Sequence, residues 1–311
     1  MATVGIDIGG TKVAAVRLEG GAVVESRRAA NPHGDLVAAA GEAARSVWAD
    51  DVVAVGVGVA GLVRFPEGTL VWGPHVSGTE VPIREDVEAN LGVPVFADND
   101  ANLAAFGEMR LGAAQGYEHV LLVTLGTGIG GAVIIAGQIY RGISFAGEWG
   151  HMVYDPKGLL CDCGKRGCWE TVASGPALVR FARESLTLNP ESSLARRLPE
   201  DYSAEDITAA ADAGDEIARG LVAQVGAEFG RGLCSLIAIF DPEAIVISGG
   251  LGSVGESLVG PARRVAADAL HGGAYRLLPP ILVATLGPEA GAVGAASMAQ
   301  AIIDNEITLE P

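Results

Sequence analysis

LLVTLGTGIGGAVII, residues Leu121–Ile135, consists of two apolar runs joined by a glycine-rich turn and contains no charged residue. Extended to Tyr140, the stretch is long enough to span a membrane, but five glycines and two threonines interrupt it, which favours two strands around a turn. The chain opens in the same way, because Thr3–Ile8 predicts a strand, a Gly-Gly-Thr turn follows, and Lys12–Leu18 predicts a second strand. This weak internal duplication predicts two halves of related build.

The order of the elements around these two hairpins is typical of an α/β protein. Helical spacing of apolar residues covers Asp35–Trp48, a buried strand is expected over Val52–Val59, and a charged helix over Ile83–Leu91 precedes a strand at Val93–Ala97. The later elements are helices over Pro176–Leu186, from Ser203, over Asp215–Phe240 and from Pro288, and strands over Ala244–Ile247 and Ile281–Ala284. Alternating strands and helices predict the α/β class.

Composition narrows the range of functions. A chain of 311 residues, 49% of them hydrophobic and 44 of them glycine, is expected to form about two globular, soluble domains. The net charge of −17 argues against a nucleic acid or an anionic membrane surface as a partner, although it does not exclude a small phosphorylated ligand. No basic and apolar leader opens the chain, and four cysteines, including an isolated Cys234, fit a reducing compartment. We therefore expect a cytoplasmic protein.

The two glycine turns are candidate phosphate-binding sites. Gly126–Gly131 satisfies G-x-G-x-x-G, but a strand follows it where a dinucleotide site needs a helix, and the chain lacks a Walker P-loop. Each turn is rich in backbone N–H groups and threonine hydroxyls that can hold anions. Either turn alone is more simply an ordinary β-turn, whereas a matched pair in two halves favours phosphate binding. Asp7, ahead of the first turn, could hold Mg²⁺ through water.

Three of the four cysteines lie in one short stretch, GEWGHMVYDPKGLLCDCGKRGCWE, residues 147–170. Cys161, Cys163 and Cys168, with His151 ahead of them, offer a complete tetrahedral set of ligands, which is the pattern of a structural zinc site. The alternative is a disulfide or idle thiols, but a bridge between Cys161 and Cys163 would be strained. Two acids, Glu148 and Glu170, flank the cluster as either surface charges or functional groups.

Asp98, Asn99 and Asp100 follow a predicted strand and precede a predicted helix. Asp98 or Asn99 is a good helix N-cap, and one cap residue suffices, so two polar groups remain at the carboxyl end of a strand, where α/β proteins bind ligands. The residues themselves leave the two interpretations, a helix cap and a ligand site, equally open. The helix dipole should keep Asp100 ionised near neutral pH. Asp98 is expected to contribute only to the cap.

Seven motifs, in order along the chain, resemble the ROK family of sugar kinases, and most closely its bacterial glucokinases. They are DIGGTK (7–12), GVAGLV (58–63), DNDAN (98–102), LGTGIGG (125–131), GEWGH (147–151), CDCGKRGCWE (161–170) and SGG (248–250). The resemblance implies the actin-like ATPase fold, which is ribonuclease H-like and has two α/β domains around a cleft. We expect a small domain over residues 1–112, joined by a C-terminal helix at about 288–311, and a larger domain over 113–287 carrying the zinc site and oligomer contacts.

The resemblance also implies a role for each matched residue. Asp100 would be the general base, and zinc would be bound by His151, Cys161, Cys163 and Cys168. Sugar hydroxyls would be contacted by Asn99, Asp100, Glu148, His151 and Glu170, and by the backbone of Gly61. ATP with Mg²⁺ would be held by Asp7, Gly9, Gly10, Thr11, Lys12, Gly126, Thr127, Gly128 and Gly130, with Gly249 and Gly250 beside the adenosine. Such proteins are typically homodimers or homotetramers.

These residues predict ATP-dependent phosphorylation of glucose at the 6-hydroxyl. One departure from the family pattern is His75, which stands where an asparagine is expected in the segment Gly73–Glu80 near the sugar pocket. N-acetylmannosamine, mannose or fructose therefore remain alternative substrates, and polyphosphate an alternative donor. A sugar-responsive repressor is disfavoured because Asp7 stands too near Met1 to leave room for a DNA-binding domain. A sensor without catalysis is disfavoured by the intact Asp100.

Overall fold

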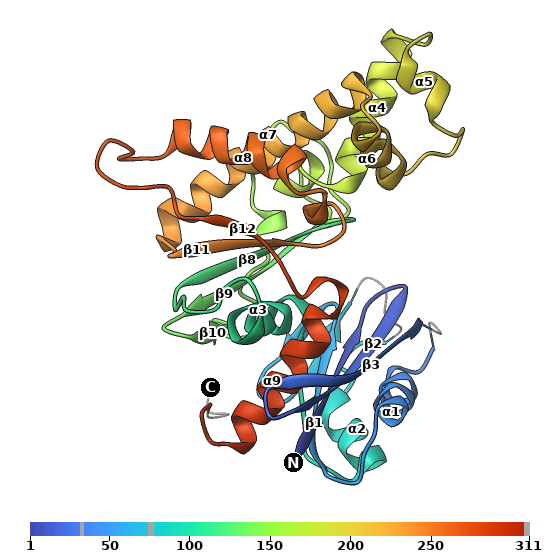
Figure 1. Cartoon of the computed structure of the whole chain (residues 1–311), viewed down its shortest axis with the longest axis vertical. Helices are drawn as coiled ribbons and strands as arrows, with labels where there is room; N and C mark the ends of the chain where they lie inside the picture. The colour runs from blue at the N-terminus through green and yellow to red at the C-terminus, as the bar shows by residue number, and fades with distance from the viewer. Residues whose placement is uncertain (32–33, 74–77, 308–311) are drawn as a thin grey trace. The chain divides into compact units, whose positions relative to one another are not determined.

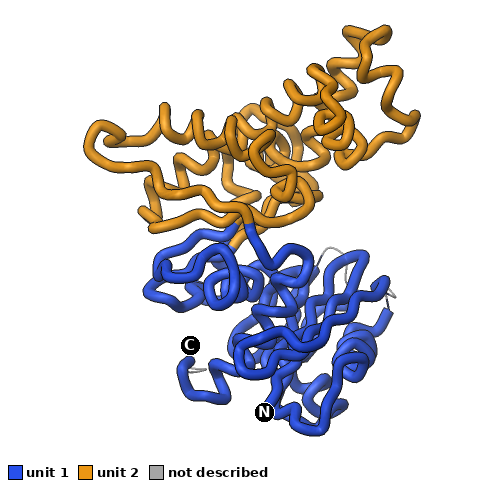
Figure 2. Tube along the Cα trace, viewed as in Figure 1, with its two compact units in different colours: residues 1–122, 132–147, 284–311 blue, residues 123–131, 148–283 orange. Residues whose placement is uncertain are grey.

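The computed structural model describes residues 1–31, 34–73 and 78–307, so the departure at His75 lies outside the described residues (Figure 1). The chain forms two compact units (Figure 2). Unit 1 comprises residues 1–122, 132–147 and 284–311, and unit 2 comprises residues 123–131 and 148–283. The division into domains at residues 112 and 287 stays a prediction.

Unit 1 is built on a five-stranded sheet of order β3-β2-β1-β4-β7. The strands are β1 (Ala2–Ile8), β2 (Lys12–Glu19), β3 (Ala22–Ala30), β4 (Val52–Val59) and β7 (Val95–Asn99). The first three pair antiparallel through tight turns, whereas β1, β4 and β7 run parallel. The carboxyl ends of these three parallel strands therefore meet at one edge, which is the edge where the predicted unit 1 residues lie.

Helices cover both faces of this sheet. Helices α1 (Leu36–Ser46) and α2 (Ile83–Leu91) pack through Leu36, Ile83 and Val87 onto the apolar face that includes Val4 and Ile6. Helix α9 (Ala290–Ile303) covers the other face and also contacts α3 (Asp100–Leu111). A short hairpin, β5 (Leu62–Arg64) and β6 (Thr69–Trp72), follows β4.

Glycines on the second face of β1 and β4 allow α9 to lie directly on the sheet. A Cβ atom at Gly5 would lie 1.9 Å from the Ala292 carbonyl oxygen, and one at Gly56 would lie 2.0 Å from that of Ala295. Because side chains alternate along a strand, Asp7 faces α9 as well, against Gly291 near the start of that helix. The close approach of α9 thus places the Asp7 carboxyl in a crowded environment.

The second sheet has the order β10-β9-β8-β11-β12 and repeats the strand order of the first sheet position by position. Its strands are β8 (Val120–Leu125), β9 (Ile129–Ile135), β10 (Gln138–Tyr140), β11 (Ala244–Ser248) and β12 (Ile281–Val283). Again a glycine turn joins the first two strands of the set, and β11 and β12 pair parallel. The predicted duplication is therefore present in the strand order as well as in the sequence.

Five helices belong to unit 2: α4 (Gly175–Leu188), α5 (Ser193–Arg197), α6 (Ala204–Asp212), α7 (Glu216–Phe240) and α8 (Glu256–Ala269). Helix α7 is long and apolar enough to cross a membrane, but half of its most apolar window is buried within the protein. Its buried stripe includes Val225, Phe229 and Leu233, and it packs extensively on α8. Helix α7 is thus a core helix of unit 2.

Most predicted elements are present, with small shifts at their ends. Strand β7 begins and ends two residues later than predicted, the last helix begins at Ala290, and Ser203 forms the expected capping box with Asp206. Strand β3 and the β5–β6 hairpin were not predicted. Strand β3 is exposed or half-buried along its whole length, so its sequence carries no apolar alternation.

Candidate active site

The unit 1 residues predicted to be functional gather at the carboxyl ends of β1, β4 and β7. In the sheet register, Asp7 on β1 stands opposite Gly58 on β4, which in turn stands opposite Asp98 on β7. Asn99 ends β7, Asp100 begins α3, and Gly61 follows β4. Parallel strand ends thus assemble residues that lie far apart in the sequence, as ligand sites in open α/β sheets do.

Asn99 is the N-cap of α3 and also fixes its neighbour across the sheet edge. Its Oδ1 atom accepts hydrogen bonds from the N–H groups of Ala101 at 2.9 Å and Asn102 at 3.1 Å, while its Nδ2 atom donates to the Gly61 carbonyl at 3.0 Å. Gly61 has a φ of 141°, and a Cβ atom there would lie 2.4 Å from the Trp72 carbonyl oxygen, so glycine is required. Asn99 and Gly61 therefore form one rigid corner.

Asp98 does not merely contribute to the helix cap, and that prediction is wrong. The residue is 2% exposed, and its Oδ2 atom lies 2.8 Å from Nε and 2.7 Å from Nη2 of Arg141. Its Oδ1 atom accepts from the Asn99 N–H at 2.7 Å and from Nδ2 of Asn102 at 3.0 Å. The Arg141 guanidinium also stacks over the Phe65 ring at 3.7 Å. This buried network holds the backbone directly ahead of Asp100.

Asp7 and Asp100 are two acids held close enough to interact inside unit 1. Burial, and then the neighbouring Asp100 carboxylate, raise the pKa of Asp7 to about 7. Burial likewise raises the pKa of Asp100, although the hydrogen bond from the Ala101 N–H at 2.9 Å opposes the rise. Desolvation thus outweighs the hydrogen bonds from the start of the helix, and the expectation that Asp100 is ionised near neutral pH stays a prediction.

The first glycine turn presents its tip to solvent. The Gly9 N–H donates to the Lys12 carbonyl at 3.0 Å, which closes the turn, and the Asn31 N–H donates to the Thr11 carbonyl at 2.9 Å. Gly10 is half-buried, while Thr11 and Lys12 are exposed. Hydrogen bonds to the Thr11 and Lys12 carbonyls thus fix the turn, and the exposed residues Thr11 and Lys12 are accessible to a ligand.

The second glycine turn, between β8 and β9, is held by side chains as well. The Gly126 N–H donates to the Gly128 carbonyl at 3.0 Å, and the Gly130 N–H donates to the Thr124 hydroxyl at 3.1 Å. Oε2 of Glu170 lies 3.4 Å from the Ile129 nitrogen. Thr127 at the tip is exposed.

A pocket of about 620 Å³ opens beside this second turn, within unit 2. The turn and the end of β11 line it through Gly126, Thr127 and Gly250, and α4 and α6 line it through Arg183 and Glu205, among others. Gly249, with a φ of 86°, stands where a Cβ atom would lie 2.4 Å from the Leu125 carbonyl oxygen. Since the pocket combines a glycine turn with charged and apolar walls, it fits a nucleotide in kind and size.

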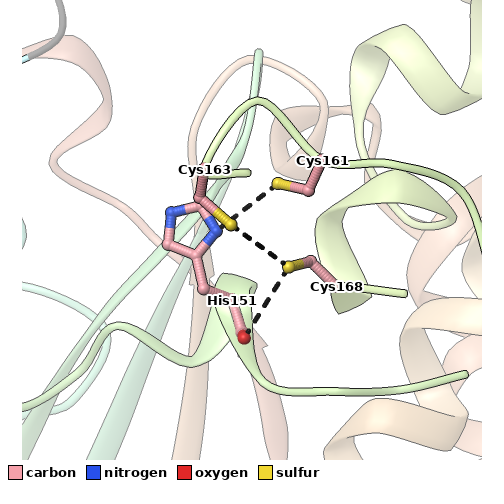
Figure 3. A group of neighbouring side chains, drawn as sticks. All are labelled: His151, Cys161, Cys163 and Cys168. Atoms are coloured by element: carbon pink, nitrogen blue, oxygen red, sulfur yellow. Dashed lines mark hydrogen bonds between the residues drawn. The ribbon is translucent and has the colours of Figure 1, made fainter. Parts of the chain in front are cut away.

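The four predicted metal ligands converge (Figure 3). One ligand atom from each of His151, Cys161, Cys163 and Cys168 lies within 4.8 Å of all the others. Nδ1 of His151 is 3.7 Å from Sγ of Cys161, and the sulfurs of Cys163 and Cys168 are 3.5 Å apart. Tetrahedral zinc with three sulfurs and one nitrogen has edges of about 3.5–3.8 Å. The donor set and its spacing therefore fit zinc.

Glu170 contacts this cluster, and Glu148 lies on the same loop. Oε1 of Glu170 is 3.0 Å from Sγ of Cys161 and 3.4 Å from Nδ1 of His151. Glu148 is exposed and precedes the 3₁₀ turn η1 (Trp149–His151), within which the His151 N–H donates to the Glu148 carbonyl at 3.2 Å. The unit 2 residues predicted to meet sugar thus share one tightly folded segment.

Sequence reasoning missed three residues that support these sites. Arg141 neutralises Asp98, Trp149 lies against the second glycine turn, and Trp169 stacks on Phe229 of α7 at 5.3 Å. The two tryptophans could have been singled out, because each stands next to a predicted sugar-binding acid. Arg141 left no comparable signal, since its partner is distant in sequence.

Two sheets with one strand order, each with a glycine turn after its first strand, define the actin-like ATPase class. A model of the ROK family matches residues 3–302. A glucokinase from Streptomyces coelicolor is 39% identical over 310 residues, covering 96% of this chain and 97% of that protein. The chain belongs to the ROK family, as its motifs predicted.

Solved structures agree with this assignment. The crystal structure of a ROK family glucokinase from Streptomyces griseus, in complex with glucose and AMPPNP, matches with a TM-score of 0.87 and 38% identity, covering 96% of this chain and 99% of that one. A ROK hexokinase from Thermus thermophilus matches with a TM-score of 0.79 and 34% identity, covering 98% and 100%. The predicted fold class is confirmed.

Proposed function

We propose that this chain is a glucokinase that transfers the terminal phosphoryl group of ATP to the 6-hydroxyl of glucose. The observation that carries the proposal is the pair of glycine turns, one beside the Asp7–Asp100 acid pair and one beside a nucleotide-sized pocket. The similarity to glucokinases over nearly the whole chain supports the same substrates. Phosphoryl transfer depends on positioning and charge neutralisation, which are the functions these groups can supply.

Asp100 is the general base of this proposal. It begins α3 on a backbone fixed by Asn99 and the buried Asp98–Arg141 pair. Its raised pKa makes it a stronger proton acceptor than an ordinary aspartate, because the more basic carboxylate takes the hydroxyl proton more readily. The proton moves from the sugar hydroxyl to the Asp100 carboxylate as the hydroxyl oxygen attacks phosphorus.

Magnesium fits beside Asp7. Oδ1 of Asp7 is buried and has no hydrogen-bond partner among the described residues, although the residue itself keeps partial access to solvent. A carboxylate in that state is stabilised by a cation, and a hydrated Mg²⁺ ion carried by ATP would supply it. When bound, the ion neutralises phosphate charge. Gly9, Gly10, Thr11 and Lys12 would hold phosphate oxygens on the same side.

Zinc is the proposed structural ion of unit 2, held by His151, Cys161, Cys163 and Cys168. With no open ligand position, the ion stabilises the loop and takes no part in the reaction. His151 would bind zinc through Nδ1 and leave Nε2 for a sugar hydroxyl. Asn99, Glu148, Glu170 and the backbone of Gly61 would contact the remaining hydroxyls, and Gly126, Thr127, Gly128, Gly130, Gly249 and Gly250 would hold the nucleotide.

The zinc proposal is tested by metal analysis. Purified protein should contain about one zinc per chain, and Cys168→Ser should lose zinc and weaken glucose binding more than nucleotide binding. Cys234→Ser is the matched control, because the Cys234 thiol lies on α7, donates a hydrogen bond to the Gly230 carbonyl and is not one of the proposed zinc ligands. Absence of zinc from fully active protein after chelation would contradict the assignment.

The substrate proposal is tested with a panel of sugars and donors. Glucose, mannose, fructose, N-acetylmannosamine and 2-deoxyglucose would each be tried with ATP and with polyphosphate, and the sugar phosphate measured. We expect glucose with ATP to have the highest kcat/KM, and removal of one bound hydroxyl to cost about ten- to a hundredfold. If another hexose had the higher kcat/KM, that hexose would replace glucose as the proposed substrate, and the proposed kinase activity would stand.

Cytoplasmic location and a homodimeric or homotetrameric state belong to the same proposal. They are supported by the composition of the chain and by its family membership. Light scattering of the purified protein at several concentrations tests the assembly, and a single species of one chain's mass, 31.6 kDa, would overturn it.

A further inference from the structure

Two buried tryptophans stand next to the two acids of the loop in unit 2. Trp149 follows Glu148 and is 6% exposed, and Trp169 precedes Glu170 and is 0% exposed. Each indole donates its N–H to a backbone carbonyl: Trp149 to Gly130 at 3.1 Å, and Trp169 to Glu228 at 3.2 Å. The two side chains therefore anchor the same loop to different parts of the unit.

Trp149 anchors the loop to the second glycine turn. A Cβ atom at Gly131 would lie 1.9–2.1 Å from atoms of the Trp149 ring, so the ring rests directly on the backbone of Gly131. The neighbouring Gly150 is equally close, since its Cβ atom would lie 2.1 Å from the Ile129 carbonyl oxygen. An edge-on contact with Phe240 at 6.1 Å holds the far side of the indole.

The Gly130 residue is consequently held from both sides. Its N–H donates to the Thr124 hydroxyl at 3.1 Å, and its carbonyl accepts from the Trp149 indole. Trp149 is itself part of the 3₁₀ turn that ends at His151, in which the His151 N–H donates to the Glu148 carbonyl. A shift of Glu148 or His151 must therefore move the peptide groups of the turn.

We propose that Trp149 is a positioning residue that couples sugar binding to nucleotide binding. It transmits the position of Glu148 and His151 to the Gly126–Gly131 turn, so that bound glucose presets the turn for ATP phosphates. The inference rests on the proposed function, in which the acids meet the sugar and the turn meets the nucleotide. Coupling of this kind is reciprocal, so ATP presets the sugar loop to the same degree.

Trp169 provides a matched comparison within the same loop. It stacks on Phe229 at 5.3 Å with an interplanar angle of 1°, and its ring rests on Gly232 of α7. Its indole N–H bonds to α7, not to the turn. Trp169→Phe thus removes a hydrogen bond of the same kind from the same loop and leaves the Trp149–Gly130 hydrogen bond in place.

The test is a binding cycle measured by calorimetry on the full-length, zinc-loaded protein. The affinity for AMPPNP with Mg²⁺ would be determined with and without saturating glucose, and the ratio of the two affinities is the coupling factor. Trp149→Phe keeps an aromatic ring and loses the N–H, and it should reduce the coupling factor by about five- to tenfold. Trp169→Phe should keep the wild-type factor while weakening glucose binding.

Three results would overturn the inference. They are no coupling in the wild-type protein, a wild-type coupling factor in Trp149→Phe, and an equal loss of coupling in Trp169→Phe. A tryptophan that only fills the core would lower stability in both variants and leave the coupling factor unchanged. Failure of the wild-type protein to bind glucose and AMPPNP at all would instead refute the proposed function.

A second measurement keeps the inference testable if Trp149→Phe does not fold. Protein carrying 5-fluorotryptophan gives one fluorine resonance for each tryptophan, and Trp169→Phe together with variants of the remaining tryptophans, Trp48 and Trp72, assigns them. The Trp149 resonance should shift with glucose and also with AMPPNP, whereas that of Trp169 should shift with glucose alone. A Trp149 resonance that ignores AMPPNP would overturn the inference.

Discussion

The two glycine turns are built alike but differ in the residue beneath them. Asp7 precedes the first turn and Thr124 precedes the second, each two residues ahead of the first glycine. Thr124 is neutral and bonded, because its hydroxyl accepts the Gly130 N–H at 3.1 Å. Asp7 is an acid whose pKa is raised to about 7, and its Oδ1 atom is buried without a hydrogen-bond partner among the described residues. Two turns of the same backbone form therefore follow residues of different chemistry, a hydrogen-bonded threonine and a buried acid.

This difference indicates where the chemistry lies. The Thr124 hydroxyl is already hydrogen-bonded within the protein. The turn that follows Thr124 can therefore hold a ligand without any change in the protonation of this residue. The turn over Asp7 stands beside a second acid, Asp100, and both pKa values are raised by burial. Unsatisfied buried charge is costly to the folded state and persists at functional sites, where a substrate or an ion satisfies it. We infer that the reacting groups lie in unit 1, whereas unit 2 contributes binding groups alone.

Asp100→Asn is the strongest way to break this comparison. The amide keeps the size of the side chain but cannot accept a proton, so kcat should fall about 10²- to 10⁴-fold with little change in ATP affinity. Steady-state kinetics with glucose and ATP measure the effect. Asp86→Asn is the control, since Asp86 also stands in the first turn of a helix and is exposed. If Asp100→Asn kept more than a tenth of the wild-type kcat, the general base would have to be a residue other than Asp100.

Asp98→Asn sharpens the comparison, because Asp98 belongs to unit 1 but touches no predicted ligand. Removing its charge leaves the Arg141 guanidinium without a counter-ion, and the single amide oxygen cannot accept from both Arg141 and the Asn99 N–H. We expect kcat to fall about ten- to a hundredfold, together with a loss of stability of about 3 kcal/mol. Activity assays and urea unfolding check both effects.

Glu80→Gln is the matched control for that change. Glu80 pairs with Arg64 at 3.1 Å, but both side chains are substantially exposed, so the pair should contribute far less to stability than the buried Asp98–Arg141 pair. Equal effects of Asp98→Asn and Glu80→Gln would mean that burial gives the Asp98–Arg141 pair no special role.

The role of Asp98 also marks the limit of what the sequence could predict. Local patterns predicted β1, α6 and the cluster of His151 with three cysteines, because alternation, capping and cysteine spacing act over short distances. The Asp98–Arg141 pair joins residues far apart in the chain, and nothing near either residue signals the other. The state of Asp7 depends on Gly291, which only the packing of α9 brings to it. Such properties arise from tertiary structure.

Asp7→Asn tests whether the buried carboxylate ahead of the first turn destabilises the folded protein. In the folded protein the pKa of Asp7 is about 7, against 3.8 for a free side chain, so the folded state keeps its proton where the unfolded state has lost it. This carboxyl therefore destabilises the fold increasingly as pH rises from about 4 to about 7, and fully above that. In the absence of magnesium, Asp7→Asn should raise the free energy of unfolding at pH 8 by about 1–3 kcal/mol.

The control for that measurement is the same pair of proteins at pH 3.8, where both carry a neutral side chain at this position for much of the time. The gain in stability should shrink there. Urea unfolding at the two pH values gives both numbers. A variant less stable than wild type at pH 8 would show that Asp7 is satisfied within the fold, and the two turns would then be alike in charge as well as in backbone.

Thr124→Val is the mildest change and tests the other side of the comparison. Valine keeps the shape of threonine and removes the hydroxyl, so the Gly130 N–H loses its acceptor at 3.1 Å. Gly130 is only partly buried, and water can replace much of the lost bond, so we expect the KM for ATP to rise about two- to fivefold. The kcat should stay near wild type because no charge has changed, and Thr124→Ser, which restores the hydroxyl, should behave as wild type.

Steady-state kinetics over a range of ATP concentrations separate the KM for ATP from kcat. If Thr124→Val lowered kcat as strongly as Asp100→Asn, the turn after Thr124 would be as close to the reaction as the turn after Asp7. The division between reacting and binding groups would then fail.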